Sequence, residues 1–217
     1  MKEAGQEEAK MAIESNSVDM NGTPMISVVC DGSWAKRSYR GGGNYNSLSG
    51  VATIIGVKSG KVLYLGVKNR YCCVCQRAEN RGEVPVKHTC YKNWKLSSTA
   101  MEATIIAEGF CCSLEMHNLI YSKMIADGDS SCFKKILDSR PYETCVVQKI
   151  ECTNHLLRNY SSKLREISQT KGVPGAVRNV IANNILRCRS AITKAVQHRK
   201  VEDCTNEEKI INLKKDV

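Results

Sequence analysis

The chain has 217 residues, of which 42% are apolar, and it carries a formal charge of +10. This apolar content is enough for a buried core and excludes a wholly disordered chain. There is no run of 18 apolar residues, and the amino terminus is acidic where a signal peptide would be apolar, so we expect neither membrane insertion nor secretion.

The positive charge is unevenly distributed along the chain. Residues 1–20 hold five acids against Lys2 and Lys10, which leaves 30 basic and 17 acidic side chains, a surplus of 13, in the remainder. A surplus of this size is typical of proteins that bind nucleic acid, because Lys and Arg displace condensed counterions from the phosphates. A basic surface that contacts only solvent is the alternative.

The first part of the chain is predicted to be rich in β-structure. A polar or helical lead-in covers residues 1–24, and a strand follows at about 25–31. Two β-rich runs, 48–57 and 62–71, are joined by a short turn, which predicts an antiparallel hairpin. A cysteine-rich insertion fills residues 72–97.

The second part alternates between helical and strand patterns. Thr99 to Glu102 fits a capping box at the start of a helix that should run to about His117. The later predicted elements, in order, are a strand at 119–126, a short helix from 129 or 130 that ends before Pro141, a strand at 146–152, and helices from Thr153 and over 176–199.

Read in order, these elements give β-β-β-α-β-α-β-α and a helical tail. By analogy of element order this is the ribonuclease-H-like α/β fold, a mixed sheet in which the first and fourth strands are neighbours. We therefore expect a core over residues 25–168 with the cysteine-rich loop inserted, followed by the start of a helical insertion domain at 169–217.

Two of the strand-like runs end at an aspartate followed by glycine, Asp31-Gly32 and Asp127-Gly128. If the two strands are neighbours, the carboxylates meet at the rim of the sheet. Paired carboxylates are suitable ligands for Mg²⁺ or Mn²⁺. Each Asp-Gly is alternatively a simple turn, and Asp127 to Asp129 could cap the next helix.

The chain has twelve cysteines, which we expect to be free or metal-bound in a reducing compartment. Cys72-x-x-Cys75, followed after twelve residues by His88-x-Cys90, has spacings that suit tetrahedral zinc. Four protein ligands would leave no open position, which favours a structural site. Cys73 offers a competing thiolate, and unligated surface cysteines are the alternative.

Two further groups are candidates for contacts with nucleic acid. Lys36, Arg37 and Arg40 follow the first aspartate and lie beside the aromatic residues Trp34 and Tyr39. Trp34 could equally be a core residue.

His155 forms a CxxH pattern with Cys152 at the junction of the fifth strand and the following helix. The pattern is consistent with a contact to DNA phosphate near the metals. The other interpretation is a buried thiol and an imidazole that only supports the fold.

Taken together, several linked motifs resemble the Mutator-like transposase domain, from about residue 10 to the end of the chain. They are Val29-Cys30-Asp31-Gly32-Ser33-Trp34-Ala35-Lys36-Arg37, Cys72 to Cys75 with His88-Thr89-Cys90-Tyr91-Lys92-Asn93-Trp94, Ser97 to Glu102, Asp127 to Ser131, and Ile150-Glu151-Cys152-Thr153-Asn154-His155-Leu156-Leu157-Arg158-Asn159.

This resemblance implies a DDE enzyme that uses Asp, Asp and Glu with two divalent ions to nick and join DNA. Asp31 and Asp127 match the first two acids, Cys152 with His155 matches the CxxH signature, and Arg158 follows it as a candidate DNA contact. The implied partners are the transposon ends and the target DNA, with no membrane. The implied location is the nucleus, and self-association is left open.

The expected third acid is a departure from this pattern. By the resemblance it is a Glu that follows a helical insertion, and we expect the chain to end inside that insertion. Glu166 is the best internal substitute, whereas Glu102 is better explained by the capping box. The sequence thus predicts the amino-terminal part of a transposase whose activity alone is uncertain. The rivals are a non-enzymatic DNA-binding or scaffold protein with a structural zinc site, and a defective fragment that folds poorly.

Overall fold

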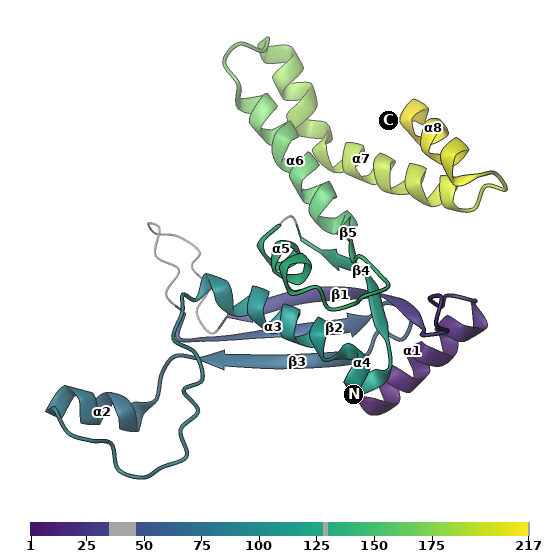
Figure 1. Ribbon diagram of the computed structural model, residues 1–217. Coiled ribbons are helices and arrows are strands. Elements are labelled where there is room, and N and C mark those ends of the chain that lie inside the picture. Colours follow the sequence, from purple (N-terminus) through teal and green to yellow (C-terminus); the bar gives the residue numbers. More distant parts are fainter. Residues whose placement is uncertain (35–46, 128–129, 217) are drawn as a thin grey trace. The chain divides into compact units, whose positions relative to one another are not determined.

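The computed structural model describes residues 1–34, 47–127 and 130–216. It divides into two compact units, residues 1–151 and residues 152–217 (Figure 1). The first unit contains the sheet and the cysteine-rich loop, and the second is helical. In the described part of the chain, no helix combines the length and the apolar character that a membrane span requires.

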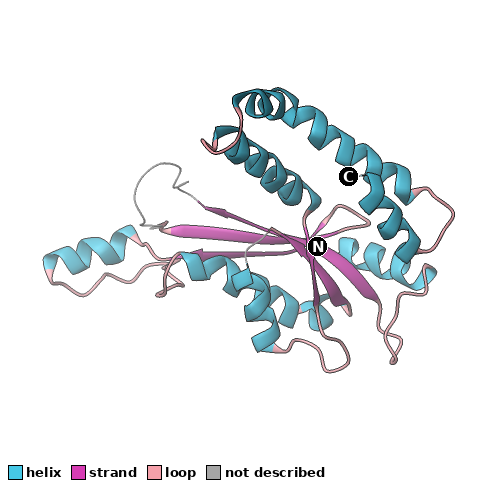
Figure 2. Ribbon diagram, turned by 90° about the horizontal axis from the view of Figure 1, so that it is seen from above, coloured by secondary structure: helices cyan, strands magenta, loops and turns pink. Residues whose placement is uncertain are grey.

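The first unit is built on a five-stranded mixed sheet with the order β3-β2-β1-β4-β5. Its strands are β1 Met25–Trp34, β2 Ser49–Gly56, β3 Val62–Asn69, β4 Ile120–Ala126 and β5 Gln148–Glu151. Strand β1 pairs antiparallel with β2 and parallel with β4, and β2 pairs antiparallel with β3. The predicted hairpin and the predicted neighbourhood of the first and fourth strands are both confirmed. Figure 2 shows the twist that such a sheet acquires.

The helices largely follow the predicted order, with differences in detail. Those of the first unit are α1 Lys2–Glu14, α2 Cys73–Arg81, α3 Thr99–Cys111, α4 Ser113–His117 and α5 Ser130–Ser139. The single helix predicted from Thr99 to His117 is divided at Cys112, where the backbone leaves regular helical geometry (φ −87°, ψ −6°). Asn118 then ends α4 in the left-handed region (φ 52°), which Asn tolerates well.

The two faces of the sheet are buried to different degrees because side chains alternate along each strand. On one face, Val28, Ile54 and Met124 are fully buried beneath the helices. Helix α3 packs on β2, β3 and α5, and it runs across these strands in Figure 1. On the other face, Leu65 and Val67 of β3 remain about half exposed (48% and 51%). The core of the first unit therefore lies between the sheet and α3.

Helix α1 is part of this unit, because its side chains contact the sheet. Glu8 is 1% exposed, and its Oε1 accepts hydrogen bonds from the Ser59 amide (2.7 Å) and the Ser59 hydroxyl (2.8 Å). A Cβ at Gly56 would overlap the Glu8 carboxylate, so glycine is needed there for close approach. This contact ties the amino-terminal helix to the β2–β3 turn.

The second unit consists of α6 Thr153–Gln169, α7 Gly175–Lys200 and α8 Asn206–Asp216. Helices α6 and α7 form an α-hairpin, as the sequence predicted, in which Leu157 and Ile185 are buried. Helix α8 was not predicted. The Arg199 guanidinium donates to both carboxylate oxygens of Asp216 (2.6 Å each), which fastens α8 to the end of α7.

Candidate metal sites at the sheet rim and in the cysteine-rich loop

Asp31 and Asp127 occupy matching positions on neighbouring parallel strands. The last residue pair between β1 and β4 is Val29 with Ile125, and each aspartate lies two residues beyond this pair. Asp127 directly follows the end of β4, and both aspartates are exposed. The strand register therefore places the two carboxylates at the same level of the carboxyl-terminal rim.

The first Asp-Gly pair is not a turn, contrary to one of the alternatives considered from the sequence. Strand β1 continues through Asp31 and Gly32 to Trp34, and Asp31 pairs with Thr53 of β2. Asp31 is therefore fixed by the sheet ladder. Gly128 and Asp129, which belong to the second Asp-Gly motif and its capping alternative, lie outside the described residues.

Glu102 does not form the capping box that the sequence suggested. The N-cap of α3 is Ser98, one residue earlier than that pattern requires, and it makes no side-chain capping bond. The Ser98 hydroxyl instead donates to the Ser47 carbonyl (2.7 Å). The half-buried Glu102 carboxylate lies against Gly32, the residue that follows Asp31.

The thiol closest in sequence to Asp31 is unsuited to bind metal. Cys30 is 6% exposed, and burial strongly raises the pKa of its thiol. Nearby negative charge on Cys132, Glu102 and Asp31 raises this pKa further. Cys30 therefore remains a neutral core thiol, and the rim offers carboxylate oxygens as its charged ligands.

A second set of ligands lies in the cysteine-rich loop. The ligand atoms of Cys72, Cys75, His88 and Cys90 all lie within 4.8 Å of one another, so the sequence-predicted set is brought together. His88 Nε2 is 3.2 Å from the sulfur of Cys72 and 3.5 Å from that of Cys75, and the sulfurs of Cys75 and Cys90 are 3.6 Å apart. Ligands around a tetrahedral zinc ion are separated by about 3.5–3.8 Å, given typical Zn–S and Zn–N distances. The four residues fit zinc.

The surroundings of the cluster prepare two ligands for a cation. The backbone amide of Cys75 stabilises the thiolate of Cys72 and lowers its pKa to about 6. His88 Nδ1 lies 2.7 Å from the Val86 carbonyl, which orients Nε2 toward the sulfurs and raises the pKa of the imidazole to about 9. A bond with Cys90 raises the pKa of Cys75 to about 11. Cys73, the competing thiol, is exposed and is not one of the four grouped residues.

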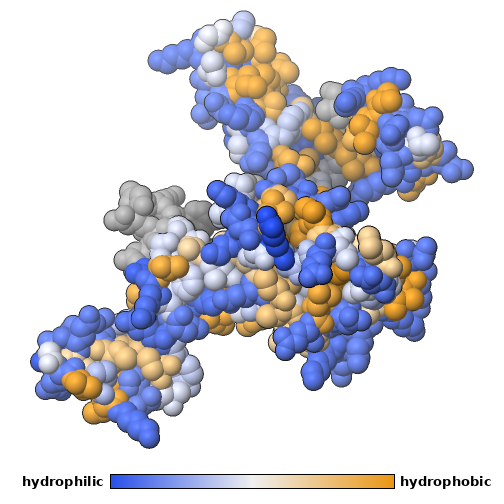
Figure 3. Space-filling model, viewed as in Figure 1, coloured by the Kyte–Doolittle hydropathy of each residue, from blue (hydrophilic) through white to orange (hydrophobic). Residues whose placement is uncertain are grey.

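The loop has little apolar packing of its own. Between residues 72 and 97, Val84, Val86 and Tyr91 are at least 73% exposed, and much of this arm is hydrophilic in Figure 3. Its return to the sheet is fixed by Asn93, whose side chain accepts from the Asn69 amide (2.7 Å) and donates to the Val67 carbonyl (2.9 Å). The ligand cluster is therefore the main element able to order the outer part of the loop.

The remaining predicted site residues are not placed beside the rim by the structure. His155 lies on α6 in the second unit, where its amide donates to the Cys152 carbonyl (2.9 Å). Within the described chain, its buried Nδ1 has no hydrogen-bond partner. Arg158 is exposed on the same helix, and Glu166 pairs with Lys163 (2.7 Å). Lys36, Arg37 and Arg40 lie outside the described residues.

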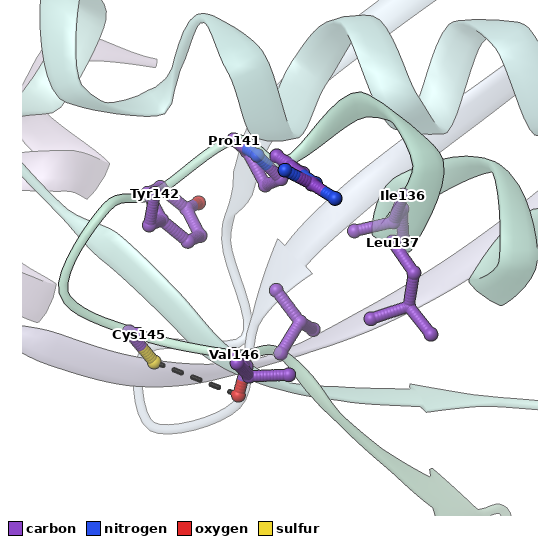
Figure 4. A pocket seen from close by; sticks show the side chains of 8 residues that line it. Ile136, Leu137, Pro141, Tyr142, Cys145 and Val146 are labelled. Carbon is purple, nitrogen blue, oxygen red and sulfur yellow. Dashed lines mark hydrogen bonds between the residues drawn. The ribbon is translucent and has the colours of Figure 1, made fainter.

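A separate apolar cavity lies at the opposite end of the parallel strands. It has a volume of about 230 Å³ and is lined by the end of α5 and the segment that leads into β5, including Ile136, Tyr142 and Val146 (Figure 4). The Cys145 thiol there donates to the Val146 carbonyl (3.7 Å), and burial raises its pKa. Because this cavity precedes β5, whereas Asp127 follows β4, it is distinct from the acidic rim.

Comparison with known proteins identifies the family. The family model for Mutator-like transposases matches residues 1–217, which is the whole chain. The chain therefore belongs to the Mutator-like transposase family. No match was found among curated proteins or among solved structures.

Proposed function

We propose that the chain provides metal-binding acids for DNA strand cleavage and transfer, with Asp31 and Asp127 as the first two ligands of a divalent ion. The observation that carries this proposal is the β1–β4 register, in which both aspartates lie two residues beyond the Val29–Ile125 pair. The strand order β3-β2-β1-β4-β5 supports our assignment of a ribonuclease-H-like sheet. Membership of the transposase family supports DNA as the substrate.

The donor set at the rim suits a hard cation such as Mg²⁺ or Mn²⁺. Both aspartates are exposed at strand positions that the sheet holds in place, and their oxygens are the ligand type these ions prefer. When bound, such ions polarise the scissile phosphate and stabilise the attacking and leaving oxygens. Asp31 and Asp127 would hold the charge in register with the DNA backbone.

Basic residues around the rim are proposed to position DNA. Lys36, Arg37 and Arg40 follow β1 in sequence, and Arg158 follows His155 on α6. Their positive charge suits phosphate, and His155 would add a hydrogen-bond donor to the same backbone. We also propose a nuclear location, as expected for an enzyme acting on chromosomal DNA.

The cysteine-rich loop is proposed to hold zinc in a structural role. Its four ligands fill a tetrahedral set, so a bound ion would have no position for substrate water. Residues Cys72, Cys75, His88 and Cys90 would then fix an arm that begins at the end of β3. This arm lacks the buried apolar area that would order it otherwise.

The proposal is tested by Mn²⁺ titration of zinc-loaded protein, measured by calorimetry. Replacing either aspartate, in Asp31→Asn or Asp127→Asn, should weaken Mn²⁺ binding at least about tenfold because a charged ligand is lost. Asp138→Asn, at an exposed acid on α5, is the matched control and should bind like wild type. Absence of Mn²⁺ binding by wild type, or equal binding by all variants, would refute the metal site.

The same protein can be tested for DNA binding by fluorescence anisotropy. Duplex binding that persists without any Mn²⁺ affinity would favour the rival, a non-enzymatic DNA-binding or scaffold protein that keeps the zinc loop. Duplex binding together with Mn²⁺ affinity that depends on Asp31 and Asp127 would favour the transposase proposal.

A further inference from the structure

We propose that Glu102 is a third carboxylate ligand of the divalent ion at the rim and that this chain supplies it from helix α3. The inference rests on the proposed function, because it concerns the same ion as Asp31 and Asp127. It assigns a metal-binding role to a residue that the local sequence pattern explained as a helix cap.

The position of the Glu102 carboxylate is fixed by its contact with Gly32. A Cβ on residue 32 would lie 2.6 and 2.7 Å from the two carboxylate oxygens of Glu102, closer than real Cβ atoms approach. The carboxylate therefore occupies the space that any other residue's side chain would fill. Glycine at position 32 opens this space directly beside Asp31.

The helix holds Glu102 in this place through its neighbours. Met101 and Ala103 are 0% and 6% exposed, so the start of α3 is anchored in the core. Glu102 itself is half-buried, at the boundary between this core and the rim. A carboxylate held on a packed helix is pre-organised for binding, because little conformational entropy remains to be lost.

The edge of β1 explains how acids from different elements reach one ion. Within the described chain, β1 beyond Val29 pairs only with β2, because β4 ends at Ala126. Glu102 reaches this open edge over Gly32, from the face that α3 covers. Asp31 reaches it from β1 itself, and Asp127 from the end of β4. An ion beside the open edge of β1 is therefore accessible to all three carboxylates.

A second glutamate on the same helix provides a contrast. The Glu108 carboxylate contacts the Lys68 ammonium (2.6 Å), so its charge is used in an ion pair with β3. Glu102 and Glu108 thus have the same chemistry on one helix, and only Glu102 is directed to the rim glycine. This makes Glu108→Gln a matched control for Glu102→Gln.

The test is Mn²⁺ binding to zinc-loaded protein, followed by the electron paramagnetic resonance signal of free Mn²⁺. Glu102→Gln should lower affinity about tenfold or more with an unchanged melting temperature, since it removes a charged ligand and keeps the side-chain shape. Glu108→Gln should bind within about twofold of wild type, because removing an exposed charge has a small effect. Equal affinity of Glu102→Gln and Glu108→Gln would overturn the inference.

A second pair of variants tests the role of the glycine. Gly32→Ala should displace the Glu102 carboxylate, lowering both the melting temperature and Mn²⁺ affinity. Gly32→Ala combined with Glu102→Ala should recover the melting temperature by removing the overlap, while Mn²⁺ affinity stays low. Recovery of affinity in the double variant would show that Glu102 is not a ligand.

The two proposals fail in different ways. If Asp31→Asn loses Mn²⁺ and Glu102→Gln does not, the third ligand is refuted and the proposed function stands. If wild type takes up no Mn²⁺, the proposed function is refuted and the inference falls with it.

Discussion

The acidic rim and the cysteine-rich loop position their ligands by opposite means. At the rim, Asp31 is fixed by strand pairing above a core that includes Val28 and Ile54, both 0% exposed. In the loop, Cys72, Cys75, His88 and Cys90 are surrounded by side chains that are largely exposed. The rim is thus formed by folding of the sheet, whereas the loop depends on the ion that its ligands bind. The two sites should therefore respond differently to loss of metal and to damage of the core.

The largest expected effect is loss of order in the loop when zinc is removed. Structural zinc contributes about 10–16 kcal/mol of binding free energy in small zinc domains, far more than the few buried contacts of residues 72–97. A chelator, or Cys75→Ser, should raise amide hydrogen exchange throughout this loop and leave β1 and β4 protected. Cys73→Ser is the control, because that exposed thiol is outside the cluster. Continued protection of the loop after chelation would contradict the comparison.

Damage to the core should have the reverse pattern. Phe110 of α3 is fully buried and packs edge-to-face on Tyr121 of β4, with ring centroids 5.3 Å apart. Phe110→Ala should lower the free energy of unfolding by about 3–5 kcal/mol, measured by urea denaturation. Leu65→Ala, at a side chain that is 48% exposed, should cost much less. Similar losses for both variants would show that the core does not lie beneath α3.

The pH dependence of zinc affinity tests the electrostatics of the loop. At pH 6–8 the Cys75 thiol, with a pKa of about 11, and the His88 imidazole, with a pKa of about 9, are protonated without metal. Zinc must displace both protons, so its affinity should rise with pH, by up to about 100-fold per unit. Below pH 6 the Cys72 thiol, with a pKa of about 6, adds a third proton to displace. A flat profile from pH 6 to 8, measured with a competing chelator, would contradict these pKa values.

The smallest expected effect concerns the ion pair between Glu108 and Lys68. The side chain of Glu108 is 42% exposed, so water screens much of the attraction. Glu108→Gln should change the free energy of unfolding by less than about 1 kcal/mol in the same urea assay. A loss above about 2 kcal/mol would mean that the first unit relies on this charge pair, and the core would then be a weaker explanation of the rim's rigidity.

The strand arrangement could be predicted from the sequence because strand signals are local. The apolar runs before Asp31 and Asp127 and the short turn between the hairpin strands gave the main elements. The Cys and His spacing likewise led to a cluster that the structure brings together. The roles of Asp31 and Asp127 in metal binding remain predictions.

Other features depend on contacts between distant residues, which local patterns do not contain. Glu8 is an acid in a polar segment, and only the fold shows that it is buried against Gly56 and bonded to Ser59. The contact of Glu102 with Gly32 spans 70 positions and was hidden by a plausible capping pattern. An Asp-Gly pair inside a strand is the one sequence signal that could have suggested a close approach.

The central claim is that residues 31 and 127 share one cation, and paramagnetic NMR tests it most directly. Mn²⁺ added to zinc-loaded protein should broaden the amide signals of residues 29–33 and 124–127 together, because one bound ion lies near both strand ends. In Asp31→Asn both sets should stay sharp at the same Mn²⁺ concentration. Broadening at only one of the two strand ends, or at both in the variant, would contradict a shared site.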